Sequence, residues 1–189
     1  MTRWLTALVE ELRQRVSNDS FWSREIDRLE DAQKPRTALH LAVFVEPYLQ
    51  FVLDRRKTIE SRFSCTRCAP YGSVRPGDVL LLKRSGGPVV GICQVTGVWY
   101  YELDPGSWST IRSGFAEQLC ISDPAFWSAK KHASYASLMR IEHARDFDPL
   151  PIAKRDRRGW VILSRHHEQQ DLLDPYLPGV RGQRNFPAA

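Results

Sequence analysis

Residues 54–62 read Asp-Arg-Arg-Lys-Thr-Ile-Glu-Ser-Arg, and the interpretation of the whole chain starts from this stretch. Successive side chains of a strand point to opposite faces. A strand here predicts one face with Lys57, Ile59 and Ser61 and another with Thr58, Glu60 and Arg62. It would present a cation, an anion and a planar guanidinium donor close together. A solvated edge strand with charges of both signs has the same pattern, so the flanking sequence must separate the two interpretations.

The sequence after this stretch supplies a second set of signals. A turn-rich segment around Tyr71 is followed by Gly77-Asp78 and then by an apolar strand at 79–82. This order resembles the ASCH domain of the PUA-like superfamily, whose pattern runs roughly Gly-x-Lys-x-x-Glu-x-Arg, a loop, and Gly-Asp before a strand. The matching residues are Lys57, Glu60, Arg62, Gly77 and Asp78, whereas Arg55 occupies the position of the family glycine. The resemblance spans about residues 37–165.

The resemblance implies an α+β fold: a small PUA-like β-barrel of five or six strands with flanking helices. We expect an N-terminal helical extension at 1–35, the barrel domain at 36–165 and a C-terminal tail at 166–189. In the extension, apolar residues recur at helical spacing in two stripes, the first being Trp4, Leu5, Leu8, Val9, Leu12 and Val16 and the second Trp22, Ile26 and Leu29. Ser20 is the expected N-cap of the second helix.

The barrel domain shows a succession of strand signals. Strands are predicted at 37–45, 79–83, 89–101, 135–143 and 159–163, beside the strand that contains Lys57 to Arg62. Glu46-Pro47 predicts the start of a short helix that continues through Leu53. A helical or irregular segment is predicted at 105–131 and a proline-bearing connection at 146–152. Gly86-Gly87-Pro88 indicates a hairpin turn, and Gly91 and Gly97 indicate bulges in the long strand that follows it.

Charge is distributed unevenly along a chain whose net charge is +5. Residues 54–84 contain eight basic and three acidic side chains, a difference of +5, whereas residues 1–35 contain six basic and seven acidic ones, a difference of −1. A second basic cluster occupies 154–158. Clustered cations suit a phosphate backbone, because each neutralised phosphate releases counterions. Solvated loop ends would give the same clusters, and both interpretations stay open for 154–158.

The cysteines and histidines do not form a metal-ligand pattern. Cys65 and Cys68 make one Cys-x-x-Cys pair, but Cys93 falls in a predicted strand and Cys120 in a predicted helix, so no second pair completes a zinc site. His40 alternates with leucines and is interpreted as a hydrogen-bonded strand histidine. We therefore expect no metal and no cofactor. Charges interrupt the N-terminal apolar residues, which predicts a cytoplasmic protein with no membrane association.

These features predict a binding module that holds RNA or a nucleotide in a groove of the barrel. Lys57 and Arg62 would meet a phosphate or a base edge, and Glu60 would orient them and accept from a base amino group. Tyr71 is the best stacking candidate because it lies in a turn-rich loop. The nucleic-acid-binding residues predicted are Lys57, Glu60, Arg62, Tyr71, Lys83, Arg84 and Arg158. Replacing Lys57 or Arg62 is expected to weaken binding with little loss of stability. Protein partners stay undefined.

The resemblance also implies an enzymatic alternative, because the family includes ribonucleases and a bacterial amidohydrolase acting on N4-acetylcytidine. In the amidohydrolase pattern Lys-Thr-x-Thr, the lysine and second threonine are catalytic together with a distant glutamate. The candidate catalytic residues here are Lys57, Thr58 and Glu60, with Glu60 at the second threonine position and Glu117 a candidate for the distant acid. Amide hydrolysis needs a lysine of lowered pKa, whereas a neighbouring carboxylate is expected to keep Lys57 charged. This favours binding, or cleavage of a phosphodiester, over amide hydrolysis.

Overall fold

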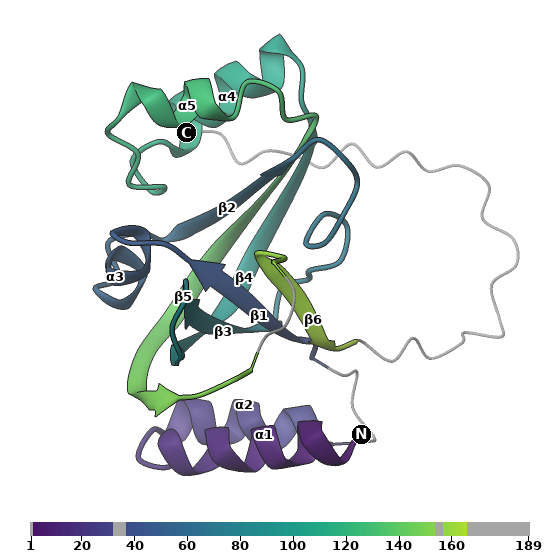
Figure 1. The fold of residues 1–189 in the computed structure, drawn as a ribbon, viewed down its shortest axis with the longest axis vertical. Coiled ribbons are helices and arrows are strands. Elements are labelled where there is room, and N and C mark those ends of the chain that lie inside the picture. Colours follow the sequence, from purple (N-terminus) through teal and green to yellow (C-terminus); the bar gives the residue numbers. More distant parts are fainter. Residues whose placement is uncertain (1, 32–36, 154–156, 166–189) are drawn as a thin grey trace, which may run out of the picture.

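The structure, a computed structural model, describes residues 2–31, 37–153 and 157–165. In these ranges Figure 1 shows a curled sheet between two helical layers. The helices are α1 Arg3–Arg15, α2 Ser20–Glu30, α3 Tyr48–Leu53, α4 Pro105–Phe115 and α5 Pro124–Ala129. The strands are β1 Leu39–Phe44, β2 Ile59–Ser64, β3 Val79–Arg84, β4 Val89–Glu102, β5 Tyr135–Leu150 and β6 Trp160–Ser164.

The six strands form one sheet in the order β2-β5-β4-β3-β1-β6. Among the described strand pairs β1 and β3 run parallel, and the others run antiparallel. β4 and β5 have 14 and 16 residues, and their pairing shifts register at three places, two of which lie at Gly91 and Gly97. Such bulges bend a strand pair, and here they curl the sheet. This curled sheet with flanking helices confirms the predicted α+β, PUA-like class.

The α1–α2 hairpin covers one face of this sheet with the apolar stripes predicted from the sequence. Leu12, Val16, Trp22 and Ile26 are almost completely buried against apolar side chains of β1, β3 and β4. Polar contacts also connect the hairpin to β5. The Trp22 indole donates to the backbone oxygen of His143 at 3.0 Å, and Arg145 forms an ion pair with Asp19 at 2.8 Å. The hairpin and the sheet therefore share one hydrophobic core.

Two details of the hairpin differ from the prediction. Trp4, placed in the buried stripe by its spacing, is 52% exposed, because it lies at the very start of α1. The N-cap of α2 is Asp19 and not Ser20, since the Asp19 carboxylate accepts the backbone N–H groups of Phe21 and Trp22. A carboxylate at this position also interacts favourably with the helix dipole.

The second half of the domain contains two further differences. β5 continues to Leu150, through part of the segment predicted as a connection, because Asp146 and Leu150 still pair with Gly91 and Val89 of β4. Cys120 lies in a turn with a φ of 55° and not in a helix. The tail at 166–189 and three residues of the second basic cluster, 154–156, lie outside the described residues.

Asp78 connects the starts of β1 and β3. It is 1% exposed and accepts the backbone N–H groups of Ala38 at 3.0 Å and Arg75 at 2.8 Å. It also contacts His40 Nε2 at 3.1 Å, and the Trp160 indole donates to His40 Nδ1 at 3.2 Å. His40 is thus a hydrogen-bonded strand histidine, as predicted. The Gly-Asp element of the sequence pattern belongs to the framework of the fold.

No described helix combines the length and apolarity needed to cross a bilayer. No group of three or more histidine, cysteine or acidic side chains in the described ranges is arranged to hold a metal ion.

Candidate functional site

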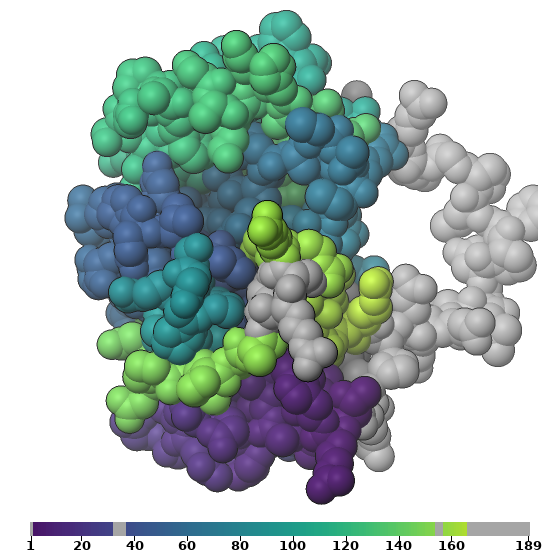
Figure 2. All heavy atoms as spheres, viewed as in Figure 1, coloured from purple at the N-terminus to yellow at the C-terminus, as the bar shows by residue number. Residues whose placement is uncertain are grey.

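A pocket of about 280 Å³ lies where three parts of the chain meet. Figure 2 shows two of them on one face of the molecule, with the green α4–α5 layer above the blue segment that contains α3. The lining residues are Val43, Phe44, Val45 and Tyr48 from the β1–α3 part, Lys57, Glu60, Ser61, Arg62 and Phe63 from β2 and the residues before it, and Leu119, Ile121, Phe126 and Lys130 from the α4–α5 part. The three charged residues of the sequence motif thus share one cavity.

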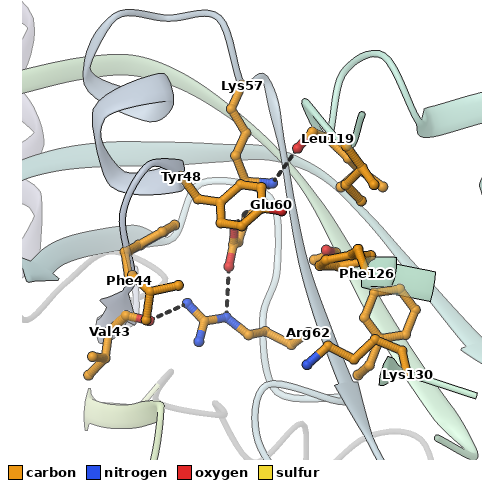
Figure 3. A pocket seen from close by; sticks show the side chains of 13 residues that line it. Val43, Phe44, Tyr48, Lys57, Glu60, Arg62, Leu119, Phe126 and Lys130 are labelled. Atoms are coloured by element: carbon orange, nitrogen blue, oxygen red, sulfur yellow. Dashed lines mark hydrogen bonds and ion pairs between the residues drawn. The ribbon is translucent and has the colours of Figure 1, made fainter. Parts of the chain in front are cut away.

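Lys57 reaches the pocket by a route that strand alternation does not predict. β2 begins at Ile59, so Lys57 precedes the strand and its side chain is free to turn toward the face of Glu60. The ammonium donates to the backbone oxygens of Ile59 at 2.6 Å and Leu119 at 3.4 Å, and lies 3.4 Å from Glu60 Oε2. The expected separation of Lys57 and Glu60 onto opposite faces is therefore wrong. Figure 3 shows Lys57 above Glu60, directed toward the Leu119 segment.

The protonation of Lys57 is governed first by burial. The side chain is 4% exposed, and burial lowers its pKa below the ordinary value of 10.5. Attraction to Glu60 raises the pKa and Arg62 lowers it further, but the net direction is downward. Burial thus opposes the effect of Glu60, which by itself favours the charged form of Lys57. The direction of the net shift is the one that amide hydrolysis by this lysine needs.

Arg62 joins the pocket to the framework of the barrel. Its Nε lies 2.7 Å from Glu60 Oε1. The other two nitrogens donate to backbone oxygens, Nη2 to Val43 at 2.9 Å and Nη1 to Gly159 at 3.2 Å. The guanidinium carbon also lies 5.4 Å from the centre of the Trp160 ring. Arg62 thus links the edge strand β2 to Val43 of β1, as Figure 3 shows, and to Gly159, the residue before β6.

The wall opposite β1 brings in residues that sequence reasoning missed. Phe126 and Lys130 of the α5 segment line the pocket, and the Phe126 ring contacts the Tyr48 ring edge to face at 6.2 Å. The Lys130 ammonium lies 5.8 Å from the centre of the Phe126 ring and forms no ion pair with a described residue. The aromatic residues followed by Lys130 and Lys131 were a local signal, but only the fold brings them to Lys57.

Tyr71 lies outside this pocket. Its ring packs against Tyr100 and Tyr135, with ring centres 5.2 and 5.0 Å apart. Tyr135 is the first residue of β5, and Tyr71 is absent from the lining that contains Lys57. A role for Tyr71 in stacking stays a prediction.

The other predicted basic residues are also dispersed. The Lys83 ammonium donates to the backbone oxygens of Gly87 and Arg84, and it thereby closes the β3–β4 turn. Arg84 forms an ion pair with Glu46 at 3.3 Å. Neither these residues nor Arg158 line the pocket. Their contribution to nucleic-acid binding is not established by their positions.

Two candidates for catalysis are likewise outside the cavity. Thr58 is exposed and contributes only its backbone to the pairing with Gln118 and Ile141. Glu117 is exposed and does not line the pocket.

Arg55 has a φ of 60°, the left-handed conformation that a glycine adopts without strain. Arg55 therefore adopts a backbone conformation in which a glycine would be unstrained.

The curled sheet, the Gly-Asp framework contact and the lysine–glutamate–arginine cluster define a domain with the ASCH-type, PUA-like fold. Solved structures support this assignment. ASCH from Zymomonas mobilis matches 67% of this chain and 87% of its own, with a TM-score of 0.54 and 9% identity. A serine-to-alanine variant of that protein matches 69% and 92%, with a TM-score of 0.56 and 10% identity. A tyrosine-to-phenylalanine variant matches 67% and 90%, with a TM-score of 0.53 and 10% identity.

These similarities concern the fold alone, because so few residues are identical. No protein-family model and no curated protein matches the sequence. The resemblance inferred from Lys57, Glu60, Arg62, Gly77 and Asp78 is confirmed at the level of the fold. The function must be argued from the pocket.

Proposed function

We propose that the pocket binds one unpaired nucleotide of RNA, with the base inside and the phosphate at the mouth. The proposal rests on one observation: a buried carboxylate, three cations and four aromatic side chains line the same cavity. Lys57, Arg62 and Lys130 against Glu60 give the lining a net charge of +2 when all four are ionised. This balance favours an anionic ligand. A cytoplasmic location is part of the proposal and fits the four free cysteines.

Glu60 is the group suited to reading a base. A carboxylate has about four acceptor positions. Lys57 and Arg62 use two of these, so Glu60 can still accept from the exocyclic amino group of a base. The edge-to-face pair of Tyr48 and Phe126 offers a ring surface beside it. Stacking on such a surface contributes about 1–3 kcal/mol per base.

A second function is favoured by the lowered pKa of Lys57. A lysine can act as a general base in its neutral form, which a lowered pKa favours, and the hydroxyl-bearing residues Tyr48 and Ser61 line the same pocket. Hydrolysis of an acylated base amino group is therefore the alternative to binding alone. Such a site would lack the catalytic threonine hydroxyl of the amidohydrolase pattern, because Glu60 occupies the position of that threonine.

The binding proposal is tested by comparing cytidine 5′-monophosphate with uridine 5′-monophosphate by calorimetry. Cytosine presents an amino group where uracil presents a carbonyl oxygen, which Glu60 repels. We expect about a tenfold preference for the cytidine nucleotide, as one hydrogen bond to a charged group provides. Glu60→Gln should remove the preference, because an amide both donates and accepts.

Glu102→Gln, which changes an exposed carboxylate outside the pocket, should leave the preference unchanged. Melting curves of each variant show whether the fold is retained. Equal affinity for the two nucleotides, or no binding of either, contradicts the proposal. Turnover of N4-acetylcytidine that disappears in Lys57→Met would make the hydrolase the better description.

A further inference from the structure

The pocket is adjoined by a second hollow on the outer surface of the α4–α5 layer. This hollow is lined by Pro105, Trp108, Ser109, Arg112, Ser113 and Lys131 and has a volume of about 660 Å³. It shares an aromatic wall with the pocket, because Phe63 of the pocket stacks on Trp108 of the hollow with ring centres 5.3 Å apart and planes 5° from parallel. Lys130 lines the pocket, and its neighbour Lys131 lines the hollow.

The two cations of the hollow have no acidic partner among residues 2–31, 37–153 and 157–165. Neither Arg112 nor Lys131 forms an ion pair with any described residue, and both are exposed. Asp104 and Asp123, at the starts of α4 and α5, instead accept backbone N–H groups of their own helices. Glu117, the remaining acidic residue of this segment, is exposed and pairs with neither cation. Inside the pocket, by contrast, Lys57 and Arg62 share Glu60.

Arg112 is held in place by rings. Its guanidinium carbon lies 5.7 Å from the centre of the Trp108 ring and 5.5 Å from that of Trp127. These two rings meet edge to face at 6.2 Å and form a rigid support. A guanidinium fixed on aromatic faces keeps its donors directed at solvent and loses little further freedom on binding. Two parallel donors suit the oxygens of a phosphodiester.

We infer that Arg112 and Lys131 form a phosphate subsite for the RNA strand that leaves the pocket. The inference rests on the proposed function, since it assumes that one nucleotide occupies the pocket. Lys130 would meet the phosphate of that nucleotide at the mouth, and Arg112 and Lys131 would bind the phosphodiesters of its neighbours along the α4–α5 layer. The protein would then prefer an oligonucleotide to a mononucleotide for a structural reason.

The test compares cytidine 5′-monophosphate with tetracytidylate by fluorescence or calorimetric titration at several salt concentrations. In the double variant Arg112→Ala/Lys131→Ala, affinity for the mononucleotide should be unchanged and the gain on lengthening the ligand should fall. Each phosphate contact to single strands contributes about 0.7 to the slope of log affinity against log salt. Losing two contacts lowers that slope by about 1.4, or about 25-fold over a tenfold change in salt.

The charge-matched control is Arg3→Ala/Arg24→Ala, which removes two exposed arginines from α1 and α2, at the opposite end of the molecule in Figure 1. This control should keep the wild-type increase in affinity from cytidine 5′-monophosphate to tetracytidylate. If the wild type binds the mononucleotide, and Arg112→Ala/Lys131→Ala gains as much affinity as the wild type when the ligand is lengthened, the subsite alone is overturned. If Arg3→Ala/Arg24→Ala lost as much of this increase as Arg112→Ala/Lys131→Ala, the subsite would also be overturned, because the net charge of the protein alone would explain the effect. Failure of the wild type to bind either ligand would overturn the proposed function together with the subsite.

Discussion

Lys57, Glu60 and Arg62 form a buried set in which two cations share one carboxylate. The Lys57 and Glu60 side chains are 4% and 5% exposed, so each charge depends on its partners for the solvation that water would give. Removing one member of such a set leaves an uncompensated charge, whereas an apolar residue of similar volume can be neutral or stabilising. A loss of function in a variant of this set therefore has to be separated from a loss of fold.

Comparing the pH dependence of folding stability in the wild type and in Lys57→Met tests whether the pKa of Lys57 is lowered in the folded protein. Because the pKa of Lys57 is lowered on folding, the unfolded chain binds more protons between this lowered value and 10.5. The stability of the wild type should then rise with pH across this window relative to Lys57→Met, which has no group to titrate there. Urea unfolding of both proteins from neutral pH upward measures the difference. Parallel stability curves would mean that Lys57 keeps its ordinary pKa.

At the scale of elements, the edge strand β2 is held at both of its sides. On one side it pairs with β5 from Ile59 to Ser64, and on the other Arg62 reaches the backbone of Val43 and Gly159. The Arg62 side chain thus connects β2 to neighbouring backbone on the side where β2 has no paired strand. From this position we expect a loss of stability when Arg62 is replaced, whereas the sequence alone predicted little loss.

Arg62→Ala should lower the free energy of unfolding by about 2–4 kcal/mol, because it breaks a buried ion pair and two hydrogen bonds to backbone oxygens. Arg62→Lys should recover little of this, since an ammonium cannot reproduce the planar fork. Arg140→Ala is the matched control on β5: its exposed guanidinium lies over Trp99, and its loss should cost about 0.5 kcal/mol or less. Chemical unfolding of the three variants measures these changes in the free energy of unfolding. Equal losses in Arg62→Ala and Arg140→Ala would contradict the role of Arg62 as a link between strands.

The elements with strong local signals could be predicted from the sequence. Gly86-Gly87-Pro88 marks the β3–β4 hairpin, and the apolar period of residues 4–16 marks α1. Gly91 shows why some signals are reliable: a Cβ there would lie 2.7 Å from the backbone oxygen of Arg145, so glycine is required. The extension of β5 to Leu150 was missed, because its pairing with β4 overrides the turn signals around Pro149.

The candidate site was only half predictable for a related reason. Glu60 and Arg62 follow from alternation along one strand, but Lys57 lies before the strand, where alternation says nothing. Lys130 and Phe126 reach the pocket only when α5 folds back over β2, and no local pattern encodes that approach. Tyr71 had a suitable loop context and lies against two other tyrosines outside the pocket.

At the scale of the whole molecule, the sheet is enclosed by helical layers with different roles. The α4–α5 layer supplies one wall of the pocket, whereas the α1–α2 hairpin at the other end of Figure 1 completes the core. Glu25 of α2 is buried there and accepts from the Gln94 amide at 3.0 Å. The helices predicted within residues 1–35 thus share a hydrophobic core with the sheet.

This integration predicts opposite outcomes for two tryptophans of the hairpin. Trp22 is 1% exposed and donates to the backbone oxygen of His143, so Trp22→Ala should cost about 3–5 kcal/mol through the cavity and the orphaned oxygen. Trp4 is 52% exposed, and Trp4→Ala should cost less than about 1 kcal/mol. Urea unfolding followed by circular dichroism, which reports the whole fold, measures both.

If the hairpin were an independent extension, Trp22→Ala would melt the helices and leave the sheet and the pocket intact. Hydrogen exchange tests this directly, because Leu39, Leu41 and Leu81 of the sheet lie in the same core cluster as Trp22. We expect protection of the β1 and β3 amides to fall together with that of α1 and α2 in Trp22→Ala, since loss of one shared core lowers the stability of every element that depends on it. Unchanged protection in β1 and β3 would show that the barrel folds without the hairpin.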